Sequence, residues 1–293
     1  MSLSFTTIAD VACGIGESPV YDEATNRVFF VDIPGRLVYA VDLATKELRS
    51  WRFESEVGSL GLAVSGRLVV ALRDRVVLFD PQSEARQELC RIEADRPETR
   101  LNDGRVGPDG AFWVGTMDDR PQRQPIASLY RVDPSGRVER KVEGLTVSNG
   151  LAWTADGETM FHTDSRGPWI DRWRFDRRTG AISDRTRIAV LDEATGRPDG
   201  GSCDAEGFYW SAGVSAGRLN RFSADGRLVE SFAVPVPSPT MPCFGGPDYR
   251  TLYLTSLRGA HPPEVLDRAA RSGSLLAAEA PVAGFPAWRF RDA

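Results

Sequence analysis

The stretch NDGRVGPDGAFWVGT, residues 102–116, contains a pattern that recurs along the chain. It returns as NGLAWTADGETMFHT at 149–163 and as DGGSCDAEGFYWSAG at 199–213, with a looser copy, GSLGLAVSGRLVVAL, at 58–72. In every copy a glycine eight residues after the first position closes a turn, and an apolar segment follows it. Apolar segments separated by Gly, Asp and Pro turns are typical of β-strands joined by hairpins.

The copies follow one another at intervals of about 40–50 residues, and two weaker copies begin at Glu17 and Met241. Six repeats of roughly this length, each with four short strands, are typical of a β-propeller. The sequence therefore predicts an all-β fold, a six-bladed β-propeller with four-stranded blades that forms a single domain over residues 1–293.

Two further elements are expected outside the repeats. The N-terminal segment SFTTIADV, residues 4–11, can pair with the last blade and close the ring, which leaves no open edge strand. One short helix is expected near the C-terminus at 262–271, because prolines stand at its start and Gly273 lies just past its end.

Charge and composition exclude several kinds of partner. The net charge is −5 and Lys and Arg form no long run, so neither nucleic acid nor a membrane surface is expected as a partner. No apolar run reaches the roughly 18 residues of a membrane-spanning helix, and the N-terminus shows no secretory signal. We expect a cytoplasmic protein whose four scattered cysteines are free thiols.

The first strand of each propeller blade lines the central channel, so the first positions of the repeats should ring a common axis. These positions are Glu17, Gly58, Asn102, Asn149, Asp199 and Met241. Asn and Asp also favour turns for local reasons. However, two carboxylates and two amides that converge in a narrow channel need a positive charge among them. An all-oxygen set suits a hard divalent cation, and three protein ligands would leave room for water and substrate.

Five motifs make the chain resemble the SMP-30/gluconolactonase/regucalcin family: GIGESPVYD, RLNDGRVGPDGAFWVGTM, VSNGLAWTADGETMFHTDS, RPDGGSCDAEGFYWSAG and CFGGPDYRTLYLTS. The resemblance covers about residues 10–290, in the family's order and spacing. It implies a six-bladed propeller with one divalent metal ion in the channel, and enzymes that hydrolyse sugar lactones to aldonic acids. Ca²⁺ is the first choice of metal, and Zn²⁺, Mn²⁺, Mg²⁺ and Fe²⁺ are alternatives.

The resemblance also implies roles for single residues. The family's Glu of the first motif falls on Glu17, its Asn of SNG on Asn149 and its Asp of PDG on Asp199. These three resemble metal ligands, and Asp199 also resembles the catalytic base that acts on water. Arg100 and Asn102 match the family's R-x-N-D-G motif and resemble residues that contact the substrate.

The reaction implied is attack of water on a lactone carbonyl polarised by the metal, with Asp199 passing the proton to the ring oxygen. The expected partner is therefore a small-molecule sugar lactone. After GTM many family members carry Ala-Glu-Glu, whereas this chain has Asp118, Asp119 and Arg120. A substrate contact in that loop is not carried over, and both the sugar and the oligomeric state stay open.

Three alternatives remain beside the lactonase hypothesis. The propeller could bind a divalent cation or serve as an interaction platform without catalysis, since fold alone does not settle function. It could also hydrolyse an organophosphate or another ester. Finally, GVSAG at 213–217 matches the G-x-S-x-G pattern of serine hydrolases, and Ser215, Asp248 and His261 follow one another in the order of a hydrolase triad. A helix should follow such a serine, however, and the sequence there predicts strands.

Other polar residues receive structural interpretations. Asp204 and Glu206 are predicted to be solvated residues of the turn that ends at Gly207. His162 lies inside an apolar strand, where a packed or hydrogen-bonded histidine is expected, and the two histidines of the chain form no metal set.

Overall fold

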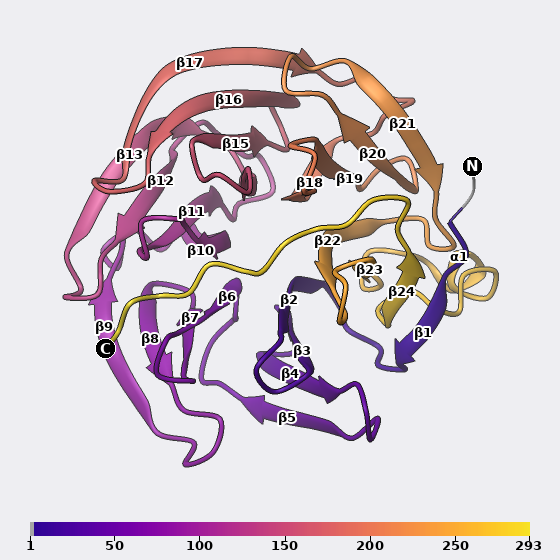
Figure 1. Ribbon diagram of the computed structural model, residues 1–293, viewed down its shortest axis with the longest axis horizontal. Coiled ribbons are helices and arrows are strands. Elements are labelled where there is room, and N and C mark those ends of the chain that lie inside the picture. Colours follow the sequence, from indigo (N-terminus) through magenta and orange to yellow (C-terminus); the bar gives the residue numbers. More distant parts are fainter. Residues whose placement is uncertain (1–2) are drawn as a thin grey trace.

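The computed structural model describes residues 3–293 and confirms the predicted fold, a six-bladed β-propeller. Six four-stranded antiparallel sheets surround a central channel (Figure 1). We number the blades 1 to 6 in chain order and give the strands of each from the channel outward. Blade 1 contains β2 (Gly16–Asp22), β3 (Arg27–Asp32), β4 (Leu37–Asp42) and β5 (Leu48–Arg52). Blade 2 contains β6 (Ser59–Leu62), β7 (Leu68–Ala71), β8 (Arg75–Phe79) and β9 (Arg86–Arg91).

The next three blades repeat this order. Blade 3 contains β10 (Thr99–Val106), β11 (Phe112–Asp118), β12 (Ala127–Val132) and β13 (Val138–Leu145). Blade 4 contains β14 (Ser148–Trp153), β15 (Thr159–Asp164), β16 (Trp169–Asp176) and β17 (Ala181–Val190). Blade 5 contains β18 (Pro198–Cys203), β19 (Tyr209–Gly213), β20 (Arg218–Phe222) and β21 (Leu228–Ala233).

Blade 6 closes the ring with strands from both ends of the chain. It contains β22 (Pro239–Gly245), β23 (Thr251–Ser256), β24 (Leu275–Glu279) and β1 (Thr6–Ala9). Strand β1 pairs antiparallel with β24, with Thr6 opposite Ala277. The predicted pairing of the N-terminal segment with the last blade is therefore confirmed.

The hydrophobic core lies between the blades rather than inside one layer. In β3, Val28 and Phe30 pack into the cluster between blades 6 and 1, whereas Phe29 and Val31 pack into the cluster between blades 1 and 2. Similar clusters fill the other blade–blade contacts. Because neighbouring side chains of a strand point to opposite faces and both faces are buried, second strands such as β3 and β7 are nearly continuous apolar runs rather than alternating patterns.

The last residues of the chain form a segment that crosses one mouth of the channel (Figure 1, yellow). We call residues 281–292 the C-terminal strap. Its backbone is anchored to three blades: Ala205 N–H donates to Ala283 O at 2.8 Å, Phe290 N–H donates to Leu62 O at 2.8 Å, and Arg291 N–H donates to Gly110 O at 3.0 Å. This mouth is therefore closed by the chain itself.

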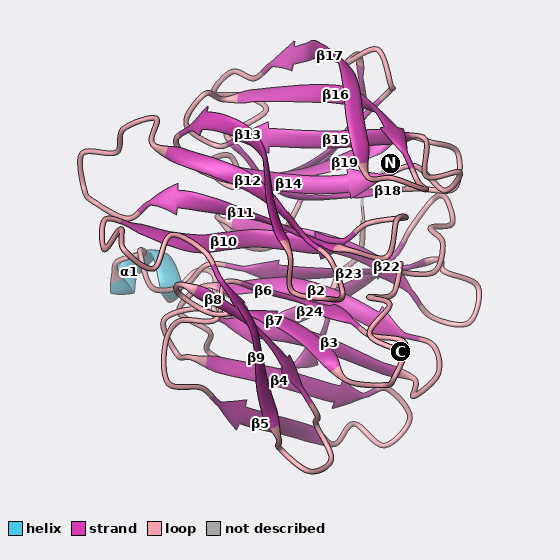
Figure 2. Ribbon diagram, turned by 90° about the vertical axis from the view of Figure 1, so that its left-hand side faces the viewer, coloured by secondary structure: helices cyan, strands magenta, loops and turns pink. Residues whose placement is uncertain are grey.

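The predicted helix is shorter than the sequence indicated. Helix α1 spans only Pro263–Leu266, and turns with i→i+3 hydrogen bonds replace it from Asp267 to Ser274. No residue of α1 is buried, so no packing stabilises a longer helix. Figure 2 shows α1 and the C-terminus on opposite sides of the ring. No helix among residues 3–293 is long and apolar enough to cross a membrane.

Candidate active site

The inner strands of five blades share an irregularity next to the repeat's first position. Their register with the second strand shifts at Glu17/Val20, Leu101/Gly104, Asn149/Ala152, Pro198/Gly201 and Pro239/Pro242. A β-bulge bends its strand and re-aims a side chain, which is why bulges are common beside active sites. The recurrence of the bulge explains how residues far apart in sequence point to one place.

Bulges also require unusual backbone dihedral angles or close packing of neighbouring strands, and glycine permits both because it has no side chain. Gly150, directly after Asn149, has φ +64°. Gly200, directly after Asp199, lies so close to Met241 that a Cβ at this position would overlap that side chain. The glycines of the repeat therefore allow blades 4, 5 and 6 to crowd around the channel.

One pocket of about 160 Å³ contains all five residues that the sequence singled out. Its lining includes Glu17, Arg100, Asn102, Asn149 and Asp199. The pocket opens on the face that carries α1, because Leu257, another lining residue, lies in the β23–β24 connection that contains this helix. We call this end of the channel the open mouth and the end beneath the C-terminal strap the closed mouth.

Asn149 and Asp199 are directly bonded. The Asn149 Nδ2 group donates to Asp199 Oδ1 at 2.6 Å and to Ser165 Oγ at 3.1 Å. The amide is thereby oriented, and its Oδ1 is buried without a hydrogen-bond donor among residues 3–293. A buried acceptor without a partner is costly unless something positive approaches it.

The carboxylates of the pocket disfavour one another. Burial, followed by the charges of Asp199 and Asp103, raises the pKa of Glu17 well above its usual range. Burial and Asp103 raise the pKa of Asp199 to about 7. The physical cause is a concentration of negative charge with little solvent, which a cation would relieve.

Asp103 is a member of this group that the sequence analysis missed. Its side chain is 3% exposed, its Oδ2 accepts from Leu151 N–H at 3.0 Å, and its Oδ1 has no partner among the described residues. Burial raises the pKa of Asp103. Asp103 directly follows Asn102, so its position next to a channel-lining residue could have indicated that it lies near the pocket. The Asp-Gly pair that it forms with Gly104 instead resembles a turn.

Arg100 is held in a fixed orientation beside the carboxylates. Its Nη1 donates to Asn102 Oδ1 at 3.0 Å, and its Nε lies 3.4 Å from Asp119 Oδ1. The Asn102 Nδ2 group in turn donates to Ser148 O at 3.0 Å. These contacts connect blades 3 and 4 and present a nearly buried guanidinium group to the pocket.

The donor set fits a hard cation. Glu17, Asp199 and the free Oδ1 of Asn149 supply oxygen atoms only, which is the chemistry preferred by Ca²⁺, Mg²⁺ and Mn²⁺. The described residues contain no cluster of three His, Cys, Asp or Glu placed to hold a metal, so an ion here would depend on the amide of Asn149. Three protein donors would leave coordination positions open for water and substrate.

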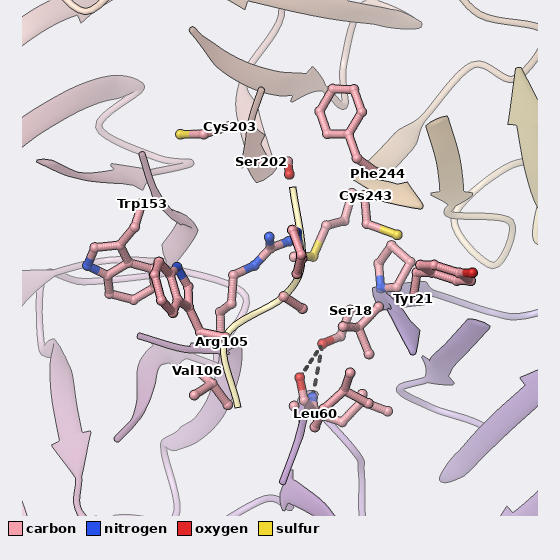
Figure 3. A pocket seen from close by; sticks show the side chains of 18 of the residues that line it. Ser18, Tyr21, Leu60, Arg105, Val106, Trp153, Ser202, Cys203, Cys243 and Phe244 are labelled. Carbon is pink, nitrogen blue, oxygen red and sulfur yellow. Dashed lines mark hydrogen bonds between the residues drawn. The ribbon is translucent and has the colours of Figure 1, made fainter. Parts of the chain in front are cut away.

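Two of the six repeat positions differ from this group. Gly58 lies against the backbone of Asn102, where a Cβ would stand 2.8 Å from the carbonyl oxygen, and Met241 lines a second cavity of about 50 Å³ deeper in the channel. Figure 3 shows this second cavity, with Arg105 directed toward its centre and Cys203 and Cys243 at its wall. Residues 285–288 of the C-terminal strap complete the lining. The carboxylates and amides of the repeat positions are therefore gathered at the open mouth, whereas the described lining of the deeper cavity contains a single arginine, Arg105, among mainly apolar side chains.

The serine-hydrolase alternative does not fit the structure. Gly213 ends β19 and Arg218 begins β20, so no helix follows Ser215. Ser215 Oγ accepts from the backbone N–H of Arg197, and His261 instead bonds Ser238 Oγ at 3.1 Å. The three residues of the sequence pattern form no hydrogen-bonded triad within the described chain.

One prediction about turn acids is wrong and one is right. Asp204 is fully buried, where its Oδ2 accepts from Trp210 Nε1 and Arg221 Nε, each at 2.8 Å; only Glu206 is exposed. The Asp204 carboxylate is therefore satisfied by a buried ion pair with Arg221 and not by solvent.

His162, as predicted, is packed and hydrogen-bonded, with Nε2 2.8 Å from Ser148 Oγ. The predicted free thiols are also found, with Cys13, Cys203 and Cys243 buried.

Comparisons with known proteins agree with this architecture. The family model "SMP-30/Gluconolactonase/LRE-like region" matches residues 15–258. The regucalcin of Xenopus laevis is 34% identical over 260 residues, which are 87% of each chain. The crystal structure of a calcium-binding protein, regucalcin, from Agrobacterium tumefaciens superposes with a TM-score of 0.94 and 25% identity, covering 99% of this chain and 98% of that one. A gluconolactonase from Xanthomonas campestris shares the fold with a TM-score of 0.72 and 23% identity, over 95% of this chain and 90% of that one.

Proposed function

We propose that this chain, which belongs to the SMP-30/gluconolactonase/LRE-like family, hydrolyses a sugar lactone to the aldonic acid with the help of one divalent cation. The observation that carries the proposal is the buried, donor-free Oδ1 of Asn149 beside two carboxyl groups, Glu17 and Asp199, whose pKa values are raised by burial and by neighbouring acids. This arrangement is expensive in an empty pocket and favourable around a cation.

Glu17, Asn149 and Asp199 would hold the ion, with Ca²⁺ as the first choice because the Agrobacterium relative is described as calcium-binding. A bound divalent cation supplies Lewis-acid polarisation of a carbonyl and makes a nearby water more acidic. Carboxylate and amide oxygens also accommodate Mn²⁺, Mg²⁺, Zn²⁺ or Fe²⁺, so the ion in the cell follows availability as well as fit.

Asp199 acts as the general base in this proposal. Its Oδ1 is fixed by Asn149, so the other oxygen, Oδ2, is free to accept a proton from the attacking water. The new C–O bond forms at the lactone carbonyl carbon, the bond from that carbon to the ring oxygen breaks, and Asp199 returns the proton to the ring oxygen as it becomes a hydroxyl. Asp103, buried behind it, keeps the affinity of Asp199 for a proton high.

Arg100 and Asn102 orient the sugar. The guanidinium group is held by Asn102 and Asp119, so it meets a substrate oxygen without first losing side-chain freedom. These two residues favour an enzyme over a protein that only binds a cation, because a cation site gains nothing from an arginine at its edge. The second candidate function is divalent-cation binding without catalysis, which the calcium-binding relative from Agrobacterium tumefaciens supports.

The test is hydrolysis of a panel of aldonolactones, followed as acid release in a pH-stat with and without EDTA. We expect turnover with added Ca²⁺ or Mn²⁺ and its loss in EDTA, restored by returning the metal. Metal binding in calorimetry without turnover of any lactone would instead support the non-catalytic cation binder. Turnover of an organophosphate or a simple ester in preference to every lactone would support the alternative of a hydrolase for those substrates.

A further inference from the structure

The open mouth is rich in arginine although the protein as a whole is acidic. Arg100, Arg123, Arg166 and Arg197 all line the pocket, whereas its only acidic lining residues are Glu17 and Asp199. The net charge of the chain is −5. A cluster of cations against this background is a local feature of the pocket, and such a cluster attracts anions by its field.

Three of these arginines have no protein partner. Within residues 3–293, the guanidinium groups of Arg123, Arg166 and Arg197 form no ion pair and no hydrogen bond, whereas Arg100 is held by Asn102 and Asp119. Arg123 is half-buried, and Arg166 and Arg197 are exposed, so their charges meet solvent at the pocket rather than a carboxylate.

The three unpaired arginines line the same pocket and lie close enough for their charges to interact. Burial, followed by the charge of Arg166, lowers the pKa of Arg123, and Arg197 contributes in the same direction. They come from the β11–β12 loop, from the β15–β16 turn and from the segment before β18, so the packing of the consecutive blades 3, 4 and 5 brings them together. Their mutual repulsion is relieved when an anion binds between them.

A dedicated loop carries Arg123 into the pocket. Asp118 is fully buried at the end of β11 and accepts from Arg120 Nε at 2.9 Å and Nη2 at 2.8 Å, and from Gln124 N–H at 2.7 Å. These bonds fix both ends of the turn that contains Arg123. The Asp118-Asp119-Arg120 sequence, where the chain departs from Ala-Glu-Glu, thus builds the support for a cation at the substrate's position.

We infer that the substrate is an anionic sugar lactone, whose carboxylate or phosphate group, remote from the lactone carbonyl, is bound by Arg123, Arg166 and Arg197. The inference rests on the proposed lactonase function and specifies its substrate class. The lactone carbonyl reaches Asp199 while the anionic end lies among the arginines, so the charged group selects the substrate and fixes which end reacts.

The test compares kcat/KM for three lactones of similar size: neutral D-gluconolactone, D-glucarolactone with a carboxylate, and 6-phospho-D-gluconolactone. We expect one anionic lactone to exceed the neutral one by at least about tenfold, since hydrogen bonds between charged groups are stronger than those between neutral groups. The two anionic arms distinguish carboxylate from phosphate. The preference should weaken as salt rises from 50 to 500 mM, because these charges are near solvent.

Variants connect the preference to the arginines. Arg123→Gln and Arg197→Gln should each lower the ratio of anionic to neutral kcat/KM by about tenfold. The matched control is Arg178→Gln, in the exposed turn after β16, which should leave the ratio as in the wild type. Equal kcat/KM for neutral and anionic lactones, with a ratio unmoved by Arg123→Gln, would overturn the inference and leave the proposed lactonase standing.

A second readout separates the inference from the function on which it rests. With Ca²⁺ present, D-glucarate or 6-phosphogluconate should bind more tightly than D-gluconate in calorimetry, and Arg123→Gln should remove the difference. If no lactone is hydrolysed, the proposed function fails, and this binding difference still supports an anionic ligand. Equal affinity for D-gluconate and for the two sugar acids with a second anionic group would count against the anionic ligand, whether or not catalysis occurs.

Discussion

The two mouths of the channel use the same strands in opposite ways. At the open mouth, the bulged starts of β2, β10, β14 and β18 place carboxylates, amides and arginines around an accessible pocket. At the closed mouth, the C-terminal strap covers a cavity whose wall includes Phe244, Phe285 and Trp288. The open mouth therefore gathers several charged groups, whereas the closed mouth is mainly apolar, with Arg105 as the one charged residue among the described residues that line its cavity. Chemistry and stability are therefore located mainly at different faces of the ring, so each can be altered separately.

The largest expected effect is at the open mouth. Asp199→Asn keeps the size of the side chain but removes the base, and should lower kcat by about 10²–10⁴-fold. Added Ca²⁺ should raise the melting temperature of the wild type and have little effect on the variant, because a ligand has been lost. Without metal the variant should be at least as stable, since burial and Asp103 oppose the charge of Asp199.

The control for this substitution is Glu264→Gln, an equivalent acid-to-amide change on exposed helix α1. It should match the wild type in turnover and melting temperature. Turnover of Asp199→Asn within about tenfold of the wild type would remove this residue from the chemistry.

The next effect is at the closed mouth and concerns stability alone. Phe290 is fully buried between blades 2 and 3 and anchors the C-terminal strap. Phe290→Ala should lower the free energy of unfolding by about 3–5 kcal/mol, because the lost side chain leaves a cavity. Lactone turnover per folded molecule should stay close to the wild type, and denaturant unfolding with parallel kinetics measures both quantities.

Val64→Ala is the matched control, because the Val64 side chain is 53% exposed beside the strap, although its backbone N–H donates to Phe290 O. It should change stability by no more than about 0.5 kcal/mol. Loss of turnover in fully folded Phe290→Ala would show that the two mouths are coupled, contrary to their separation here.

The smallest effect tests how completely the strap closes its mouth. Burial raises the pKa of Cys243 to about 12 and that of Cys203 well above its usual range, and both line the closed cavity. A raised pKa keeps a thiol protonated, and therefore unreactive, at pH 8. With a disulfide reagent, the half-buried Cys90 should react first and slowly, and all thiols should react at once in guanidinium chloride. Rapid modification of Cys203 or Cys243 in the native protein would mean that the strap opens.

The sequence could predict the fold and the centre of the pocket because both follow from the repeat. The glycine and apolar spacing sets the blade, and the first position of a repeat lies at the start of an inner strand whatever the surrounding loops do. Glu17, Asn149 and Asp199 could therefore be grouped without coordinates. Met241 departs from the group because β22 places it deeper, in the closed cavity.

Features set by tertiary contacts could not be predicted from the repeat. Arg123, Arg166 and Arg197 lie in connections outside the repeat, and the packing of blades 3, 4 and 5 makes them neighbours. Asp204 looked like a turn residue because its partners, Trp210 and Arg221, come from later strands of the same blade. The length of α1 depended on packing that the sequence pattern does not reveal. Local signals describe each strand, but tertiary contacts decide what the loops do.

The most direct test of the central claim is a crystal structure with Mn²⁺ or Ca²⁺, using the anomalous signal to locate the ion. We expect one strong peak at the open mouth, with oxygen atoms of Glu17, Asn149 and Asp199 at roughly 2.1–2.6 Å from the ion. An ion bound elsewhere, or none at the open mouth at millimolar metal with these side chains unchanged, would contradict this claim.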